Sequence, residues 1–129
     1  MNEDSPSTDP RRRLGRWGEG LAATHLETLG HLIVEQNWHC RAGEIDLVTR
    51  DGETLVFVEV KTRRGRDFGL PEEGLTPRKA EKLLRLGKQY VYEHALDDVN
   101  WRIDLVAIEL DSTGKLLRCD HFPNAVFGW

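Results

Sequence analysis

Residues 43–63 read GEIDLVTRDGETLVFVEVKTR, and this stretch decides the fold. Two runs rich in β-branched and aromatic residues flank the dipeptide Asp51-Gly52, which is a favoured two-residue hairpin turn. We therefore predict an antiparallel hairpin in which Asp51 and Gly52 form the turn and connect Arg50 to Glu53.

The apolar pattern on either side of this hairpin predicts two helices and three further strands. Apolar residues recur at helical spacing over residues 12–29 and 77–94, and the second run opens with a Thr-Pro pair typical of a helix start. Strand-like runs occupy residues 31–40, 101–110 and 115–122. The resulting order, αβββαββ, predicts an α/β domain with a central mixed sheet of about five strands flanked by helices.

Length and composition indicate one soluble domain. The 129 residues are 39% hydrophobic and 31% charged, and no apolar run approaches the roughly 20 residues that cross a bilayer. Residues 1–11 lack the apolar core of a signal peptide and are typical of a flexible arm, which leaves a single domain over residues 12–129. We therefore expect a cytoplasmic protein that does not span a membrane. Cys40 and Cys119 show no Cys-x-x-Cys spacing, which disfavours a disulfide framework or a cysteine zinc site.

Charge is unevenly distributed along the chain. A net charge of -4 argues against a protein that coats nucleic acid by bulk attraction. Residues 61–88 nevertheless carry nine Lys and Arg against four Asp and Glu. We predict that basic residues of this segment contact nucleic-acid phosphates, although a basic helix stripe is equally typical of an ordinary solvated surface. The predicted contacts are Arg63, Arg64, Arg66, Arg78, Lys82 and Arg85.

The predicted hairpin also brings two carboxylates and an amine together. Alternate side chains of a strand share a face, so Glu59 and Lys61 lie on the same side of the second strand. The predicted turn pairs Asp46 with Phe57 and Glu44 with Glu59. Asp46 is then diagonal to Glu59, with Cβ atoms about 5–8 Å apart. The three groups therefore converge on one face of the hairpin.

Carboxylates within an apolar strand need a balancing positive charge. Each unpaired buried charge costs several kcal/mol, and two adjacent carboxylates repel each other. We predict that Asp46 and Glu59 bind Mg²⁺ or Mn²⁺, which prefer oxygen ligands and can activate a phosphate and a bound water. Lys61 could orient that water or offset charge on the phosphate. The alternative is an ordinary Glu59–Lys61 ion pair on an exposed sheet face, with Asp46 as a solvated neighbour.

The motifs GEIDLV and VFVEVKTR resemble the PD-(D/E)XK nuclease superfamily, whose signature is an Asp on one strand and Glu-x-Lys on the next. More closely, residues 14–110 are similar to the YraN-like bacterial family, an uncharacterised group related to archaeal Holliday junction resolvases. The similarity includes GRWGEGLAATHLETLG, Lys79 and the Arg-x-Asp of WRIDLV. The chain departs from the superfamily's name in one position, because Ile45 stands where the name has Pro.

This resemblance implies a restriction-endonuclease-like fold and a set of site residues. Asp46 and Glu59 correspond to the metal ligands, and Lys61 corresponds to the catalytic lysine. Glu19, on the first helix, corresponds to the carboxylate that completes the catalytic site. Lys79, in the second predicted helix, is the seventh predicted nucleic-acid contact.

We expect a Mg²⁺- or Mn²⁺-dependent endonuclease that acts on nucleic acid, with DNA favoured and branched forms as candidate substrates. A junction-cutting role would favour a homodimer. The alternative is a nucleic-acid-binding protein that keeps the nuclease fold without cleavage. A third reading is an interaction domain in which the acidic cluster is only structural.

Two further residue groups have simpler expected roles. Asp104 repeats the Ile-Asp-Leu-Val context of Asp46, and we expect it to pair with Arg102 on the same strand rather than to bind metal. The five histidines show no ligand spacing such as His-x-x-x-His, so we expect them to be core or surface residues.

Overall fold

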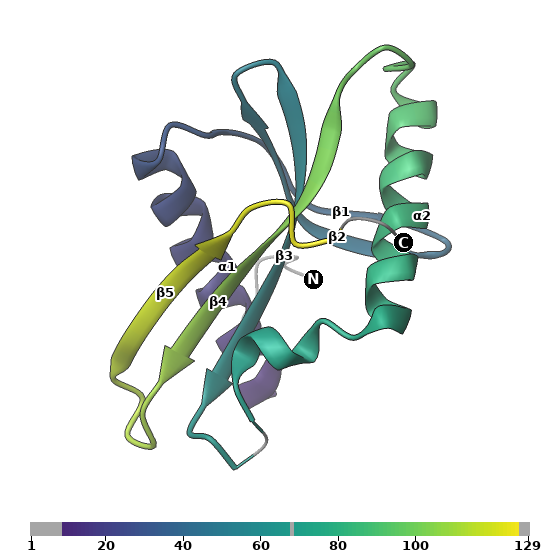
Figure 1. Cartoon of the computed structure of the whole chain (residues 1–129). Helices are drawn as coiled ribbons and strands as arrows, with labels where there is room; N and C mark the ends of the chain where they lie inside the picture. The colour runs from purple at the N-terminus through teal and green to yellow at the C-terminus, as the bar shows by residue number, and fades with distance from the viewer. Residues whose placement is uncertain (1–8, 68, 127–129) are drawn as a thin grey trace, which may run out of the picture.

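A computed structural model describes residues 9–67 and 69–126, and in this part of the chain a five-stranded sheet lies between two long helices (Figure 1). The elements follow in the order α1 (Pro10–Thr28), β1 (Leu32–Cys40), β2 (Gly43–Asp51), β3 (Thr54–Arg64), the 3-10 helix η1 (Pro71–Gly74), α2 (Pro77–Glu93), β4 (Trp101–Leu110) and β5 (Leu116–Phe122). The predicted fold class and the order αβββαββ are confirmed.

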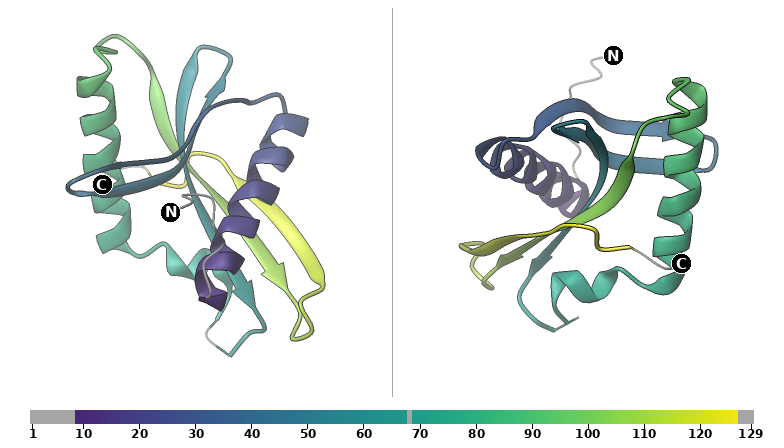
Figure 2. Two further views of the ribbon diagram at one scale, coloured as in Figure 1. Left: turned by 180° about the vertical axis from the view of Figure 1, so that it is seen from behind. Right: turned by 45° about the horizontal axis from the view of Figure 1, so that its top comes forward.

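The sheet is mixed because one of its connections is a helical crossover. The strand order is β1-β2-β3-β4-β5, with antiparallel pairs except for β3 and β4, which run parallel. Parallel neighbours need a long connection, and α2 supplies it. Figure 2 shows α1 and α2 on opposite sides of the twisted sheet. Neither of these helices is long and apolar enough to cross a membrane.

The first helix begins two residues before the predicted boundary. Asp9 is its N-cap and accepts a hydrogen bond from the backbone N–H of Arg11 at 2.9 Å, while Pro10 occupies the first turn. The prediction of an arm over residues 1–11 missed this Asp-Pro helix start. Residues 1–8 of the predicted arm lie outside the described residues.

Helix α1 buries a stripe of small and apolar residues against the sheet. Ala22, Ala23 and Leu26 are buried in a core cluster that includes Val58 of β3. Gly18 lies so close to β3 that a Cβ atom there would collide with the Thr62 hydroxyl. The absence of a side chain at Gly18 therefore sets how closely α1 approaches the strand that carries the predicted site.

Helix α2 covers the other face of the sheet. Its Thr76 cap accepts a hydrogen bond from the backbone N–H of Lys79 at 3.3 Å. Leu83, Leu86 and Tyr90 are buried in a second core cluster. The β1–β2 hairpin reaches across to this helix, as Figure 1 shows, and buries apolar residues against it.

The turn between β2 and β3 differs from the prediction by one residue in each strand. Asp51 pairs with Thr54, so the two loop residues are Gly52 and Glu53 rather than Asp51 and Gly52. Gly52 has a φ of 61°. A positive-φ glycine in the first loop position is typical of a type II′ hairpin turn. The predicted turn was therefore wrong in position, although the hairpin itself is confirmed.

The corrected turn shifts the pairing of β2 with β3 by two residues, so the paired residues keep the faces of the sheet that the prediction gave them. An odd shift would exchange the faces of the strand, whereas an even shift does not. The last β2–β3 pair is Leu47 with Val58, which sets Asp46 level with Glu59. The predicted pairing of Asp46 with Phe57 was wrong, and the corrected register brings the two carboxylate-bearing residues closer together.

Candidate functional site

Strand β2 departs from regular geometry at Asp46. Ile45 packs in the core cluster under α2, but Leu47 packs in the cluster under α1, although alternate residues of a regular strand share a face. The β2–β3 pairing ends at Leu47 and Val58. Beyond it, the backbone N–H of Val60 donates a hydrogen bond to Asp46 Oδ2 at 2.8 Å. A carboxylate therefore takes the place of the strand backbone at the end of the ladder.

The surroundings of Asp46 favour its protonated form. Burial has the largest effect, the charge of Glu59 adds to it, and together they raise the pKa of Asp46 to about 9 despite the hydrogen bond from Val60. The charge of Glu19 acts in the same direction. Ionised Asp46 would place a second negative charge beside Glu59 in a buried position, which a bound cation would balance.

Glu59 and Lys61 form the ion pair expected of neighbours on one strand face. Lys61 Nζ lies 3.2 Å from Glu59 Oε2. The alternative reading required this pair to lie on an exposed sheet face. The two side chains are only 14–15% exposed, so the pair is largely buried instead. Lys79 of α2 lines the same hollow as Glu59. The neighbouring Lys61 amine, and then partial burial, lower the pKa of Lys79.

Glu19 reaches the same cluster from α1, and Asn37 holds it there. The Asn37 side-chain amide donates to Glu19 Oε1 and to Glu44 Oε1, each at 2.7 Å. Burial, with a further contribution from the charge of Glu44, raises the pKa of Glu19, and a side-chain contact with Asp46 acts against this. The structure therefore brings together all four predicted catalytic residues, which we call the acidic cluster: Glu19, Asp46, Glu59 and Lys61.

Asn37 was not predicted as a site residue. Its φ is 53°, and Asn is one of the few non-glycine residues that often adopt this left-handed conformation. An Asn inside an apolar strand run is therefore a sequence signal for an irregular strand position. Here the irregular backbone lets one amide bridge two carboxylates.

Three hollows border the acidic cluster, and arginines line two of them. The largest has a volume of about 660 Å³ and is lined by Arg11, Leu14, Gly15, Val60, Lys61, Thr62, Arg63 and Arg64. The second is lined by Arg12, Gly15, Arg16, Glu19, Asn37 and Glu44. The third is lined by Glu44, Glu59, Lys79, Lys82, Leu83 and Leu86. Sequence reasoning missed the α1 arginines, because the run RRRLGR was divided between the predicted arm and the helix.

Four of the seven predicted nucleic-acid contacts line these hollows. Arg63 and Arg64 lie on the largest, and Lys79 and Lys82 lie on the third. Arg78 is exposed on α2. Their contact with nucleic acid stays a prediction, but four of the five stand beside the acidic cluster.

The other two predicted contacts are engaged in ion pairs. Arg66 binds both carboxylate oxygens of the buried Glu109, and Arg118 binds one of them at 2.8 Å. Arg85 lies 3.9 Å from Glu81 on the exposed side of α2. Arg66 therefore has a clear structural partner in addition to its predicted contact with nucleic acid.

Asp104 does not join the acidic cluster. Arg102 Nε donates to Asp104 Oδ1 at 2.9 Å, so the predicted pair is confirmed. His121 also contacts this carboxylate, at 2.7 Å from Oδ2. The two Ile-Asp-Leu-Val segments of the sequence therefore place their aspartates in different environments.

Comparison with known proteins gives the family. The model described as "Uncharacterised protein family UPF0102" matches residues 18–108, which include the whole acidic cluster. A UPF0102 protein of Acidothermus cellulolyticus is 52% identical over 116 residues, which cover 88% of each chain. A UPF0102 protein of Pelotomaculum thermopropionicum is 44% identical over 117 residues, which cover 91% of this chain and 98% of that protein. The chain described here belongs to the UPF0102 family.

Proposed function

We propose that this UPF0102 protein is a metal-dependent endonuclease of the PD-(D/E)XK type, which hydrolyses phosphodiester bonds of DNA at the acidic cluster. The observation that carries the proposal is the meeting of Asp46, Glu59 and Lys61 where the β2–β3 pairing ends. The resemblance assigns these residues the roles of metal ligands and catalytic lysine. Glu19 joins them through its contact with Asp46.

The donor set fits a hard divalent cation. Asp46 and Glu59 offer carboxylate oxygens, which Mg²⁺ and Mn²⁺ prefer over nitrogen or sulfur. Burial and the neighbouring acids raise the pKa of Asp46, so a cation would relieve a repulsion that the described residues leave in place. Asp46 and Glu59 would hold the metal, with Glu19 as a third acid beside them. When bound, such a metal stabilises charge on the scissile phosphate and lowers the pKa of a coordinated water.

Lys61 supplies a positive charge at the centre of the cluster. Its amine is paired with Glu59 and largely shielded from solvent. A preorganised ammonium in such a place stabilises the charge that develops on a phosphate during hydrolysis. The partly buried strand keeps Lys61 close to the carboxylates before the substrate arrives.

The substrate class follows from the arginines around the cluster. Arg11 of α1 and Arg63 and Arg64 of β3 line one hollow together with Lys61. Arginines bind the phosphates of a nucleic-acid backbone and position the strand without reading its sequence. A strand held here would place a phosphodiester next to Lys61 and the acids. Cleavage of branched DNA by a homodimer is the specific form of this proposal that the resemblance suggests.

A second candidate is a nucleic-acid-binding protein that does not cleave. The same arginine-lined hollow favours it, because phosphate binding by Arg11, Arg63 and Arg64 needs no metal. The net charge of -4 would limit its non-specific affinity.

Incubation with labelled single-stranded, duplex, flapped and four-way-junction DNAs separates the two functions. A nuclease gives products in Mg²⁺ or Mn²⁺ and none in EDTA. A binding protein retains DNA in a salt-sensitive manner, equally with metal and with EDTA, and gives no products. The panel also identifies the preferred DNA structure.

A further inference from the structure

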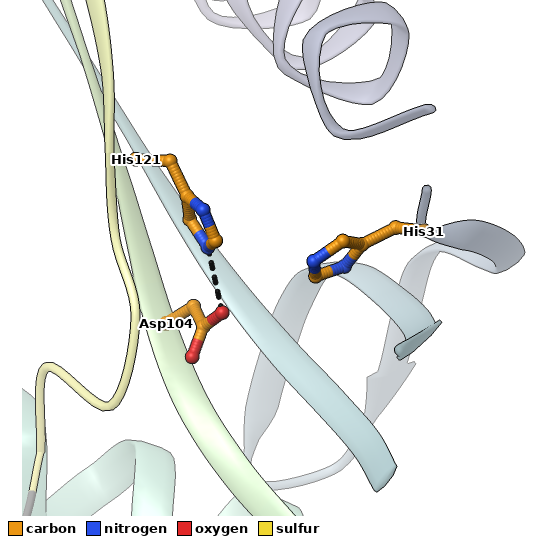
Figure 3. A group of neighbouring side chains, drawn as sticks. All are labelled: His31, Asp104 and His121. Atoms are coloured by element: carbon orange, nitrogen blue, oxygen red, sulfur yellow. Dashed lines mark hydrogen bonds and ion pairs between the residues drawn. The ribbon is translucent and has the colours of Figure 1, made fainter. Parts of the chain in front are cut away.

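A second cluster of metal-ligating side chains lies away from the acidic cluster. His31 precedes β1, Asp104 lies on β4 and His121 lies on β5, and Figure 3 shows the three side chains converging. One ligand atom from each lies within 4.8 Å of the others, and no other trio of His, Cys, Asp and Glu in residues 9–67 and 69–126 meets this condition. The imidazole rings are nearly perpendicular, with centroids 5.4 Å apart.

His31 is held in the manner of a metal-ligating histidine. Its Nδ1 forms a hydrogen bond with Thr49 Oγ1 at 2.8 Å. Its Nε2 lies 3.9 Å from Asp51 Oδ2, which is too long for a hydrogen bond. A partner on one ring nitrogen commonly orients the other nitrogen toward a metal.

Asp104 is equally well oriented. Arg102 Nε and the backbone N–H of Asn124 donate to its Oδ1 at 2.9 and 2.8 Å, and Arg102 Nη2 lies 3.2 Å from Oδ2. His121 Nε2 lies 2.7 Å from Oδ2, the contact drawn as a dashed line in Figure 3. These hydrogen bonds fix the buried carboxylate in place.

We propose that His31, Asp104 and His121 form a zinc-binding site, with Asp51 or a water as the fourth ligand. Two imidazoles and a carboxylate are typical zinc ligands, whereas Mg²⁺ and Ca²⁺ prefer oxygen alone. Zinc bonds of about 2.0–2.1 Å separate tetrahedral ligand atoms by about 3.3 Å. The 2.7 Å contact between His121 and Asp104 must open slightly. Metal binding requires the His121 tautomer that carries its proton on Nδ1, so that the Nε2 lone pair faces the metal.

The charge balance of this cluster allows a dication. The carboxylates of Asp51 and Asp104 both contact Arg102, which neutralises only one of their two negative charges. A carboxylate oxygen can also accept more than one partner, so the Arg102 contact at Oδ2 leaves a position for a metal. Arg102 then orients the two carboxylates without replacing the metal.

The site would join segments that the sheet connects only indirectly. His31 stands at the start of edge strand β1, and His121 stands on the opposite edge strand, β5. A shared metal would tie these two edges together across the α1-facing side of the sheet. Its role would be structural, and it does not depend on the nuclease activity proposed above.

Zinc binding by the full-length, chelator-treated protein tests this inference. The acidic cluster is first disabled by Asp46→Asn and Glu59→Gln, so that any metal bound there does not enter the result. In this background, calorimetric titration with Zn²⁺ should show one equivalent bound per chain. Co²⁺ should bind in its place and give the visible absorption of a tetrahedral site. No binding of either ion would overturn the inference.

Two conservative variants locate the ion. His31→Gln and His121→Gln retain a hydrogen-bonding side chain but lose the imidazole ligand. Each should weaken Zn²⁺ binding by more than the roughly 10–100-fold typical of replacing a residue that only orients a ligand. His94→Gln is the matched control, because His94 is exposed at the end of α2 and lies outside the cluster. Circular dichroism confirms that each variant is folded. Zn²⁺ affinity unchanged in both cluster variants would place any bound zinc elsewhere and contradict the proposal.

Discussion

The Asp46 carboxylate accepts a hydrogen bond from the backbone N–H of Val60 at 2.8 Å. Val60 stands between Glu59 and Lys61 in β3, so this single bond fixes the position of Asp46 relative to both. Site residues on strands are held more accurately than residues on loops. The acidic cluster is therefore assembled by the pairing of two strands, and its geometry is set before metal or substrate binds.

Replacement of Asp46 by Asn should stabilise the metal-free protein at pH 8 by about 0.5–2 kcal/mol, as replacement of charged active-site residues commonly does. The pKa of Asp46 is raised from 3.8 in the absence of these surroundings to about 9 in the folded protein. Wild type should therefore lose stability as the pH rises through this range, because the carboxylate is ionised in the unfolded chain and folding must return a proton to it. Asn keeps an oxygen for the Val60 N–H and has no charge to lose.

Urea unfolding in EDTA at pH 5 and pH 8 measures this difference. The stability gap between Asp46→Asn and wild type should widen at the higher pH. A variant less stable than wild type at pH 8, or a gap independent of pH, would refute the electrostatic account of Asp46.

Metal affinity should rise with pH between about pH 6 and pH 9. Asp46 must lose its proton to act as a ligand, and its pKa of about 9 means that metal binding competes with that proton. Mn²⁺ titrations at neutral pH in two buffers of different ionisation enthalpy should reveal proton release. The released proton should disappear in Asp46→Asn. Binding without proton release would show that Asp46 is not a ligand or is already ionised.

Gly18→Ala should destabilise the protein by about 1–3 kcal/mol, a typical cost of overpacking. The new methyl group would collide with the Thr62 hydroxyl and push α1 away from β3. Gly20→Ala is the matched control on the same helix, because a Cβ atom there meets nothing within 4 Å. It should stabilise the helix by about 0.5–1 kcal/mol through helix propensity. Thermal unfolding of both variants measures the contrast, and equal effects would argue against this close packing.

Arg63→Ala and Arg64→Ala should each weaken DNA binding and lower the slope of log K against log salt by about one. These arginines line the hollow beside Lys61. Arg13→Ala is the control, since Arg13 is exposed on α1 but lines none of the three hollows described above. Fluorescence anisotropy over a range of salt concentrations gives the slopes. An Arg13 effect as large as that of Arg63 would indicate diffuse charge attraction instead of a defined phosphate track.

Strand alternation explains why the centre of the site was predictable. Glu59 and Lys61 are two residues apart, so any extended conformation places them on one face and close together. The even register shift preserved the faces of the paired residues 47–51. At Asp46 the strand is irregular, and the hydrogen bond from Val60 holds its carboxylate beside Glu59. The prediction placed Gly52 second in the turn, whereas the structure places it first, with a φ of 61°.

The contacts that were missed depend on tertiary structure. Asn37 bridges Glu19 and Glu44 because its strand adopts an irregular conformation, which no apolar periodicity reports. His31 and His121 converge although 90 residues separate them, because the sheet twist brings its edges together on one side. Spacing rules for metal ligands apply to neighbours in sequence and cannot detect such a pair.

The most direct test of the nuclease proposal is the initial rate of DNA cleavage by Glu59→Gln compared with wild type in Mg²⁺. Glu53→Gln is the control, because Glu53 is exposed in the β2–β3 turn, away from the acidic cluster. The account predicts products from wild type and Glu53→Gln and a loss of about 10²–10⁴-fold in Glu59→Gln, in the range for removal of a catalytic group. Cleavage by Glu59→Gln at the wild-type rate, or no cleavage by a folded wild-type protein that binds the metal, would contradict it.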